Sequence, residues 1–299
     1  MNPAPFKIVH LLSQPAVRCG ALCPILGIGT INHPAAGGCD IIVAEEAALA
    51  PVIANITRAP IAAMTLVQVL RATESMSVAD ALIVESLAYA ALQGGAENAA
   101  WLQTRPPFAF PPADNEAPIL LDRHDDLLTV RLNRPMALNA VNMAMRDGLA
   151  EAFSLAALDD SITRIRLTGA GRCFSVGGAL EEFGTAPDQA TAHAVRCATG
   201  PAFMLAPMAA RSTAIEHGAC IGAGAELAAL CGRVVARSGA FFQLPEIKFG
   251  LIPGSGGTVG ISRRIGRQLT AWLALSARRI GARQALEWGL VDAISLDDG

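Results

Sequence analysis

Three glycine-rich segments stand out as places where the backbone could hold a ligand. They run from Gly171 to Gly178, from His217 to Glu226 and from Phe241 to Gly257. Glycine-rich turns bring bare backbone N–H groups close to a ligand, and a turn that enters a helix adds the positive end of the helix dipole. Two such turns could aim two N–H groups at one oxygen. That arrangement stabilises the negative charge that develops on the carbonyl oxygen of a thioester enolate.

Two glutamates belong to these segments, Glu226 in the second and Glu246 in the third. Two carboxyl groups near an oxyanion site could share proton transfer and water activation. Each feature also has a purely structural interpretation. A glycine-rich turn often only turns the chain, Glu226 could be an acid favoured by a helix dipole, and Glu246 could be a solvated loop acid. The functional interpretation therefore depends on all of these features occurring together.

Other common chemistry-bearing motifs are absent from the sequence. It contains no GxGxxG, no GxSxG and no GxxxxGK[ST], and Ser255 lies between glycines without the spacing of a nucleophile elbow. The seven cysteines form no CxxC pair and the five histidines are scattered. These spacings predict reduced, buried thiols and no metal site.

The composition predicts a protein with a large buried core. The chain has 299 residues, of which 52% are hydrophobic and 16% charged, and its mean hydropathy is +0.40. A net charge of −3 gives no electrostatic footprint for nucleic acid. No apolar stretch approaches the roughly 18–20 residues that a spanning helix needs, and Met1 to Leu12 lacks the pattern of a signal peptide. We therefore expect a cytoplasmic protein with neither a membrane nor a nucleic-acid partner.

A proline-rich linker at 106–118 divides the chain into two parts. Residues 1–105 are predicted to be mostly helical. Pro60 can open a helix, and Ser77 with Asp80 resembles a capping box for a second helix that stops at Gly94. Residues 119–299 alternate strands and helices, which is typical of an α/β domain with crossover connections. The expected elements there are a hairpin of 119–122 with 127–132, strands at 162–168, 212–216 and 234–236, and helices at 142–158, 225–230, 261–265, 268–276 and 282–288.

The order of these motifs resembles the crotonase (enoyl-CoA hydratase/isomerase) superfamily. The resemblance covers about residues 117–295. It runs through LNRPMALNA (132–140), LTG (167–169), FSVG (174–177), GAGAEL (222–227), LPE (244–246), GLIPG (250–254) and ALEWGLVD (285–292). It implies an α/β fold of the crotonase type (ClpP/crotonase-like), a spiral of ββα units. It also implies an acyl-CoA thioester substrate, no cofactor beyond the coenzyme A of that substrate, a role in fatty acid metabolism, and a homotrimer or dimer of trimers.

The resemblance also implies residue roles. Gly178 and Ala223 would donate the two oxyanion N–H groups, and Glu226 and Glu246 match the two acids of the hydratases. Contacts with substrate or coenzyme A fall on Ala137, Leu138, Val176, Gly177, Gly222, Pro245 and Gly254. The implied reaction is hydration of a trans-2-enoyl-CoA to a 3-hydroxyacyl-CoA. A Δ3,Δ2-enoyl-CoA isomerase or another crotonase reaction is the alternative, and a non-catalytic acyl-CoA-binding subunit is a further one.

Some positions depart from the family pattern. Ala179 and Gly232 stand where aspartates are common, and nothing follows Gly299, where family members usually continue with a helical segment that covers the acyl site. Residues of about 38–105 carry helical patterns in the order of that segment. We therefore expect them to act as a permuted C-terminal segment, with an unrelated helical appendage as the alternative. The apolar positions expected to be buried include Ile61, Val67, Leu82 and Leu87.

Overall fold

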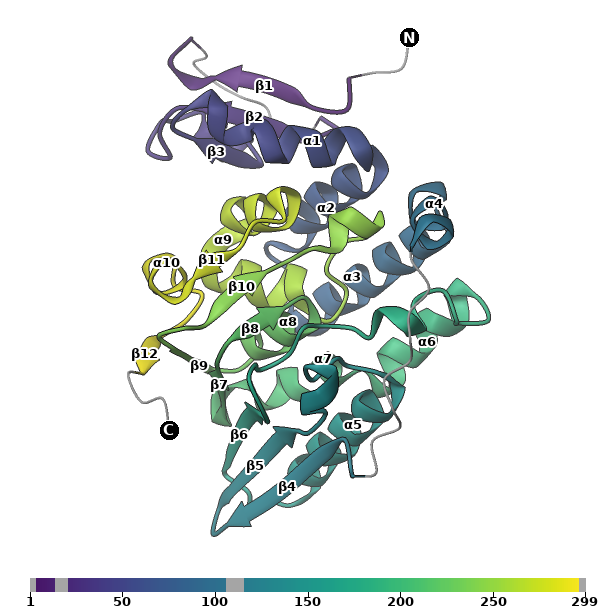
Figure 1. Ribbon diagram of the computed structural model, residues 1–299. Helices are drawn as coiled ribbons and strands as arrows, with labels where there is room; N and C mark the ends of the chain where they lie inside the picture. Colours follow the sequence, from purple (N-terminus) through teal and green to yellow (C-terminus); the bar gives the residue numbers. More distant parts are fainter. Residues whose placement is uncertain (1–3, 14–20, 106–115, 296–299) are drawn as a thin grey trace.

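The computed structural model describes residues 4–13, 21–105 and 116–295. In Figure 1 the N-terminal strands lie at the top, helices and a small sheet fill the middle, and the largest sheet lies at the bottom. Most of the predicted proline-rich linker, residues 106–115, lies outside the described residues.

The largest sheet has six strands in the order β12-β9-β7-β6-β5-β4. Strands β4 and β5 are antiparallel, and the other neighbours pair in parallel. The predicted hairpin is thus confirmed, with Asp125 at its tip in the left-handed region (φ +54°) that aspartate tolerates. The strands are β4 (Ile119–His124), β5 (Leu127–Leu132), β6 (Arg164–Gly169), β7 (Ser212–Glu216), β9 (Arg233–Arg237) and β12 (Ala293–Ser295).

Helix α5 (Met143–Leu158) packs on strands β4 and β5. The side chain of Asn142 accepts the N–H of Met145 at 3.0 Å, which confirms the predicted N-cap. The buried positions of α5 recur at helical spacing, and they face the sheet. Helices α6 (Gln189–Thr199) and α7 (Pro201–Leu205) follow in the next crossover and lie beside α5.

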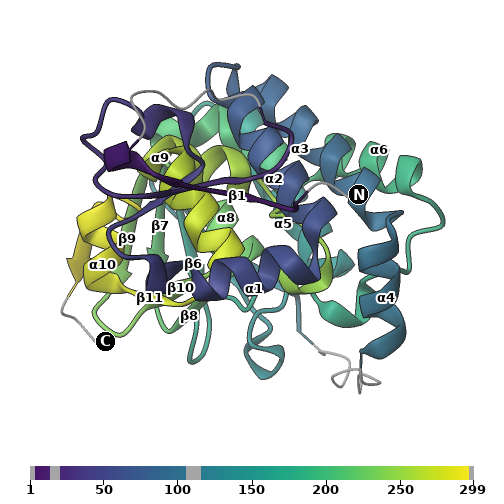
Figure 2. The same cartoon turned by 90° about the horizontal axis from the view of Figure 1, so that it is seen from above.

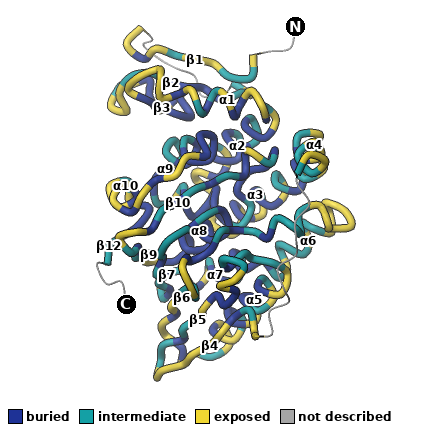
Figure 3. Tube along the Cα trace, in the orientation of Figure 1, coloured by how far each residue is buried: buried dark blue, intermediate teal, exposed yellow. Residues whose placement is uncertain are grey.

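A second, smaller sheet carries the glycine-rich turns. Strand β8 (Ala219–Ile221) pairs in parallel with β10 (Phe241–Gln243), which pairs with β11 (Ile280–Gly281). All seven residues of α8 (Ala223–Ala229) are buried, and Figure 3 shows this dark core running through the middle of the molecule. The two helical segments predicted at the C-terminal end form one kinked helix, α9 (Gly257–Ser276), with a non-helical residue at Gly266, and α10 (Ala282–Trp288) follows.

The N-terminal region contributes four helices that pack on the α/β domain. Helices α1, α2 and α3 all contact α9, and Figure 2 shows them lying across it. Ser77 Oγ accepts the N–H of Asp80 at 3.1 Å, so the capping box is confirmed. The four helices are α1 (Ala50–Arg58), α2 (Pro60–Thr73), α3 (Val78–Gln93) and α4 (Ala96–Thr104).

The predicted buried face of these helices was correct only in part. Val67 and Leu82 are buried, but Ile61 is 51% and Leu87 is 52% exposed. The buried face of α2 includes Ala63, Leu66 and Leu70, which recur at spacings of three and four residues. A strict three-residue spacing drifts around a helix of 3.6 residues per turn, and this drift explains the error at Ile61.

The N-terminal region also contains a parallel three-stranded sheet, in the order β1-β2-β3, which the sequence analysis did not predict. Its strands are only three or four residues long: β1 (Lys7–His10), β2 (Ile25–Ile28) and β3 (Ile41–Val43). No single helix of the described residues has the length and apolar character to cross a membrane. One bent pair, 46–58 with 60–73, passes by length and composition alone.

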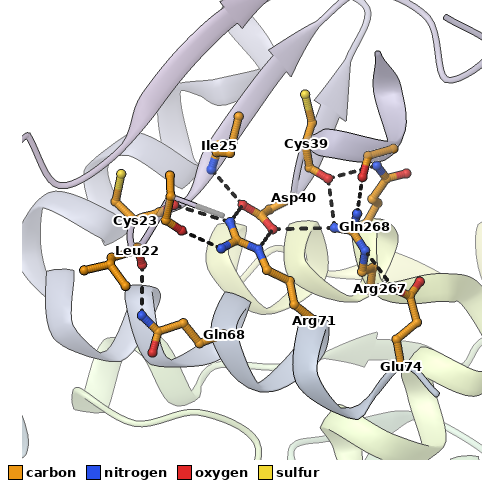
Figure 4. Close-up of polar contacts among 12 residues, drawn as sticks. Leu22, Cys23, Ile25, Cys39, Asp40, Gln68, Arg71, Glu74, Arg267 and Gln268 are labelled. Carbon is orange, nitrogen blue, oxygen red and sulfur yellow. Dashed lines mark hydrogen bonds and ion pairs between the residues drawn. The ribbon is translucent and has the colours of Figure 1, made fainter. Parts of the chain in front are cut away.

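A buried ion pair joins this small sheet to the helices. Asp40, 2% exposed, accepts hydrogen bonds from Nε of Arg71 on α2 and from the N–H of Ile25, both at 2.8 Å. Arg267 of α9 lies 3.5 Å from the same carboxylate and also bonds the carbonyl of Cys39. Figure 4 shows these groups converging between the sheet and the two helices. Because breaking such a buried pair leaves an uncompensated charge, this cluster fixes the sheet in place.

Candidate active site

The structure brings the first two glycine-rich turns together. Strand β8 meets Ser175 through an isolated bridge at Cys220, and the N–H of Ile221 donates to the carbonyl of Ser175 at 3.0 Å. Gly177 has a φ of +91°, and a Cβ there would lie 2.8 Å from the carbonyl oxygen of Ile221 and 3.3 Å from the nitrogen of Ala223. Only glycine permits this approach. The backbone on either side of Gly177 therefore lies against the start of α8.

The two predicted oxyanion donors, Gly178 and Ala223, lie in these adjoining turns. Ala223 is the first residue of α8, and its N–H precedes the first helical hydrogen bond. Within the described part of the chain, neither N–H donates to an acceptor. Gly222 positions Ala223 through its own N–H, which donates to the carbonyl of Gln243 at 2.9 Å. Two unpaired donors in adjoining turns meet one requirement of an oxyanion site.

Glu226 lies in the first turn of α8 and is 2% exposed. Its Oε2 accepts the N–H groups of Ser255 at 2.7 Å and Gly257 at 3.0 Å. Burial raises the pKa of this carboxyl well above its usual range, and the neighbouring carboxyls of Glu246 and Glu85 add to that rise. Glu226 is therefore a fixed, enclosed acid rather than a helix-terminal group facing solvent.

Glu246 begins the short 3-10 helix Glu246–Phe249 and is 8% exposed, so the interpretation as a solvated loop acid was wrong. A Cβ on Gly222 would lie 2.7 Å from its Oε1, which places the carboxyl against the oxyanion turn. Its Oε2 is buried and has no hydrogen-bond partner in the described part of the chain. Burial raises the pKa of Glu246 to about 8. This oxygen is therefore a buried acceptor that no described residue uses.

Five of the seven predicted substrate or coenzyme A positions lie on neighbouring backbone segments: Ala137, Leu138, Val176, Gly177 and Gly222. Ala137 ends the 3-10 helix Pro135–Ala137, and the carbonyl of Leu138 accepts the N–H of Val176 at 3.1 Å. The side-chain amide of Asn139 donates to three backbone carbonyls of the loop 170–174, and these bonds hold the loop against the segment that contains Ala137 and Leu138. Pro245 immediately precedes Glu246, and its carbonyl accepts the N–H of Lys248 in the same short helix.

Gly254, predicted to contact the substrate or coenzyme A, immediately precedes the turn whose N–H groups hold Glu226. A Cβ at Gly254 would lie only 2.3 Å from Cδ2 of Tyr89, the chain's single tyrosine. No larger residue fits there without displacing the ring. Among the described residues, no group of three His, Cys, Asp or Glu side chains is arranged to hold a metal ion.

Comparison with known proteins identifies the fold. The model of the enoyl-CoA hydratase/isomerase family matches residues 122–298. This chain belongs to that family. The 2,3-dehydroadipyl-CoA hydratase of Escherichia coli is 37% identical over 182 residues, which cover 60% of this chain and 70% of that protein. The 1,2-epoxyphenylacetyl-CoA isomerase of the same organism is 37% identical over 171 residues, covering 55% and 64%.

Solved structures give the same result. The enoyl-CoA hydratase of Thermoplasma volcanium superposes with a TM-score of 0.56 at 32% identity, covering 61% of this chain and 73% of that one. The crotonase fold is therefore confirmed, and the chain is an enzyme of the hydratase/isomerase family. The family model begins at residue 122, so helices α1–α4 lie outside the matched region.

Helix α3, outside that matched region, supplies an acid that the sequence analysis missed. Glu85 is 2% exposed; its Oε1 accepts the N–H of Gly256 at 2.7 Å and its Oε2 accepts that of Thr258 at 2.8 Å. In the same turn, Glu226 accepts the N–H groups of the two intervening residues, Ser255 and Gly257. Two carboxyls thus hold one turn from opposite sides. The signal in the sequence was a lone acid between buried positions of an apolar helix.

A cavity of about 390 Å³ opens beside these turns. Its wall begins at Ala179, next to Gly178, and at Gly254 and Ser255, next to Glu226. The rest of the wall includes residues of α3 and α6, among them Tyr89 of α3. Its volume is within the range of small-molecule sites. Helix α3 therefore contributes Tyr89 and Gln93 to the cavity wall, whereas Gly178, Ala223, Glu226 and Glu246 are not among the residues that line it.

Proposed function

We propose that this enzyme adds water to a trans-2-enoyl-CoA to give a 3-hydroxyacyl-CoA. The observation that carries the proposal is the pair of buried carboxyls, Glu226 and Glu246, near two adjoining turns that each contain one unpaired N–H group. A hydratase needs one carboxylate to take a proton and one carboxylic acid to give a proton. Because each carboxyl is buried and close to other acids, the pair retains a proton near neutral pH.

The reaction follows from this arrangement. The thioester oxygen accepts the N–H groups of Gly178 and Ala223. One carboxylate takes a proton from water as the water oxygen bonds to C3, and the double-bond electrons move toward the thioester oxygen. The other glutamic acid then gives its proton to C2. Water adds across one face of the double bond, and a proton exchanged between the two acids restores the starting state.

A second candidate is a Δ3,Δ2-enoyl-CoA isomerase, which moves one proton and needs one carboxyl. It is favoured by the asymmetry between the two acids. Oε2 of Glu226 is occupied by two backbone N–H groups, whereas Oε2 of Glu246 has no partner among the described residues. A single carboxyl with a free oxygen suffices for that reaction.

The two candidates are separated by assaying the purified enzyme with 2-enoyl- and 3-enoyl-CoAs. A hydratase removes the absorbance of the conjugated thioester, and Glu226→Gln or Glu246→Gln each lowers that rate by orders of magnitude. An isomerase instead creates that absorbance from 3-enoyl-CoA and tolerates loss of Glu226. The exposed Glu151→Gln on α5 is the matched control and retains the full rate.

A further inference from the structure

Three charged side chains line the cavity: Arg146, Glu182 and Arg196. Arg146 pairs with Asp147 at 2.7 Å. The Oε2 of Glu182 accepts the N–H of Met143 at 2.9 Å, at the start of α5. Of the two cations in the wall, Arg196 is the one that forms no ion pair with a described residue.

Arg196, on α6, is held by neutral acceptors of α3. Its Nε donates to Ser86 Oγ at 2.9 Å, its Nη1 to Gln93 Oε1 at 3.0 Å and its Nη2 to the carbonyl of Ser86 at 3.2 Å. No carboxylate of the described residues forms an ion pair with it. A guanidinium has five N–H donors, so two remain beyond these three contacts. The cavity wall therefore carries an oriented cation that forms no direct ion pair with a described residue, although the buried carboxyl of Glu85 lies near enough to interact with it electrostatically.

The environment of this cation is poorly hydrated. The guanidinium carbon lies 4.9 Å from the centre of the Tyr89 ring, and the side chain is half-buried. Burial lowers the pKa of Arg196 below its usual range, which reflects the unfavourable loss of water around the charge. An anion that entered the cavity would offset this loss with a charge-assisted hydrogen bond, and a carboxylate matches the planar guanidinium well.

Tyr89 defines the path from the reacting carbons to this cation. One part of its ring lies against Gly254, in the turn that holds Glu226, and the guanidinium of Arg196 lies over the ring face. The cavity wall includes both Ala179, the neighbour of Gly178, and Arg196. An acyl chain that entered the cavity beside Gly178 would therefore extend its distal end toward Arg196.

We propose that the preferred substrate is a dicarboxylic monothioester, an enoyl-CoA whose acyl chain ends in a carboxylate bound by Arg196. This inference rests on the proposed function and names its substrate class. The same guanidinium could instead meet a phosphate of coenzyme A. The two anions are distinguished by substrates that share coenzyme A and differ only at the distal end of the acyl chain.

The test uses matched pairs of trans-2-enoyl-CoAs of four to eight carbons, one ending in a carboxylate and the other in a methyl group. The wild type is expected to favour one carboxylated member by at least about tenfold in kcat/KM. Arg196→Gln should lower kcat/KM for that substrate by about ten- to a hundredfold, the usual value of a hydrogen bond between charged groups. The loss should fall mainly on KM and be much smaller for the methyl-ended partner. Arg196→Lys should recover part of the preference.

A control variant, Arg131→Gln, removes an exposed positive charge on β5 away from the cavity and should change neither rate. An equal loss for both members of every pair in Arg196→Gln would assign this residue to coenzyme A or to packing, and would overturn the inference. A wild type that prefers methyl-ended chains at every length would also overturn it.

Binding separates this inference from the proposed function. Calorimetry with the saturated CoA thioesters, carboxylated and methyl-ended, requires no turnover. If the wild type hydrates no enoyl-CoA, the proposed reaction fails, yet tighter binding of the carboxylated thioester that is lost in Arg196→Gln would still support the anion subsite. Equal binding of both thioesters would reject it.

Discussion

Glu246 keeps its proton to about pH 8 in the folded chain because burial disfavours the carboxylate, whereas its usual pKa is 4.5. Between these two values the folded state binds a proton that the unfolded state lacks. The contribution of Glu246 to the free energy of unfolding is therefore fully present below about pH 4.5 and is lost as the pH rises through 8. Glu85, with a pKa of about 7, and Glu216, with a pKa of about 8, act in the same direction.

The free energy of unfolding should consequently fall between pH 5 and pH 8. Glu246→Gln is neutral at every pH, so it should flatten this slope in part and should be more stable than the wild type at pH 8. Urea unfolding at several pH values measures both effects. An identical slope in wild type and variant would show that Glu246 is not a buried, protonated acid.

The proposed oxyanion donor at Ala223 can be tested by a substitution that removes its backbone N–H. Ala223 is the first residue of α8, a helix position that tolerates proline, and proline there has no N–H to donate. Ala223→Pro should lower hydration by about a hundred- to a thousandfold, the usual cost of one oxyanion donor. Circular dichroism and binding of a CoA thioester serve as the folding controls. A folded variant with full activity would remove Ala223 from the site.

At the scale of elements, the turn at 255–258 depends on helix α3. Glu85→Ala removes the acceptor for two buried N–H groups and the hydroxyl of Thr258. Each buried donor left unsatisfied costs about 1–3 kcal/mol, so a large loss of stability is expected, with Glu85→Gln intermediate.

Glu97 provides the matched control for this prediction. It accepts the N–H groups of Ile61 at 2.7 Å and Ala62 at 2.9 Å at the more open start of α2, where water can replace it. Glu97→Ala should therefore cost only about 1 kcal/mol, as for a lost helix cap. Urea unfolding measures the free energy of unfolding of both variants. Equal losses in Glu85→Ala and Glu97→Ala would mean that the buried contacts of Glu85 stabilise the fold no more than an exposed helix cap does.

The sequence predicted those elements whose signals are local. The capped starts of α3 and α5 and the hairpin β4–β5 follow from Ser77, Asn142 and the polar tip at Asp125. The strands β1–β3 were missed because three or four residues carry no clear periodicity. Glu85 was missed because its contact spans 171 residues of sequence, and only the packing of α3 on α9 brings it to the turn.

At the scale of the whole molecule, residues 38–105 contact the candidate site. They supply Glu85 to the turn 255–258 and Tyr89 to the cavity wall, and helices α1, α2 and α3 pack on α9. We propose that they act as a permuted C-terminal segment of the family fold. Deleting residues 1–110 should therefore give an insoluble or inactive chain. Co-expression of fragments 1–110 and 111–299 should restore some activity, because the two parts meet through packing.

A soluble fragment 111–299 with the full rate would show instead that the N-terminal region is an unrelated appendage. Light scattering on the same samples reports whether the segment also affects the oligomeric state. The structure favours the first outcome, in which the α/β domain depends on the N-terminal region. Removing α3 removes Glu85, which accepts two of the four N–H groups of the turn 255–258.

The central claim is that two buried glutamates beside an oxyanion turn hydrate an enoyl thioester. The direct measurement is the loss of conjugated thioester absorbance with a panel of trans-2-enoyl-CoAs, for wild type, Glu226→Gln and Glu246→Gln. The account predicts rapid loss with wild type and a rate lower by orders of magnitude with either variant, although both still bind the CoA thioester. Wild-type rates in both variants, or a wild type that leaves every 2-enoyl-CoA unchanged, would contradict it.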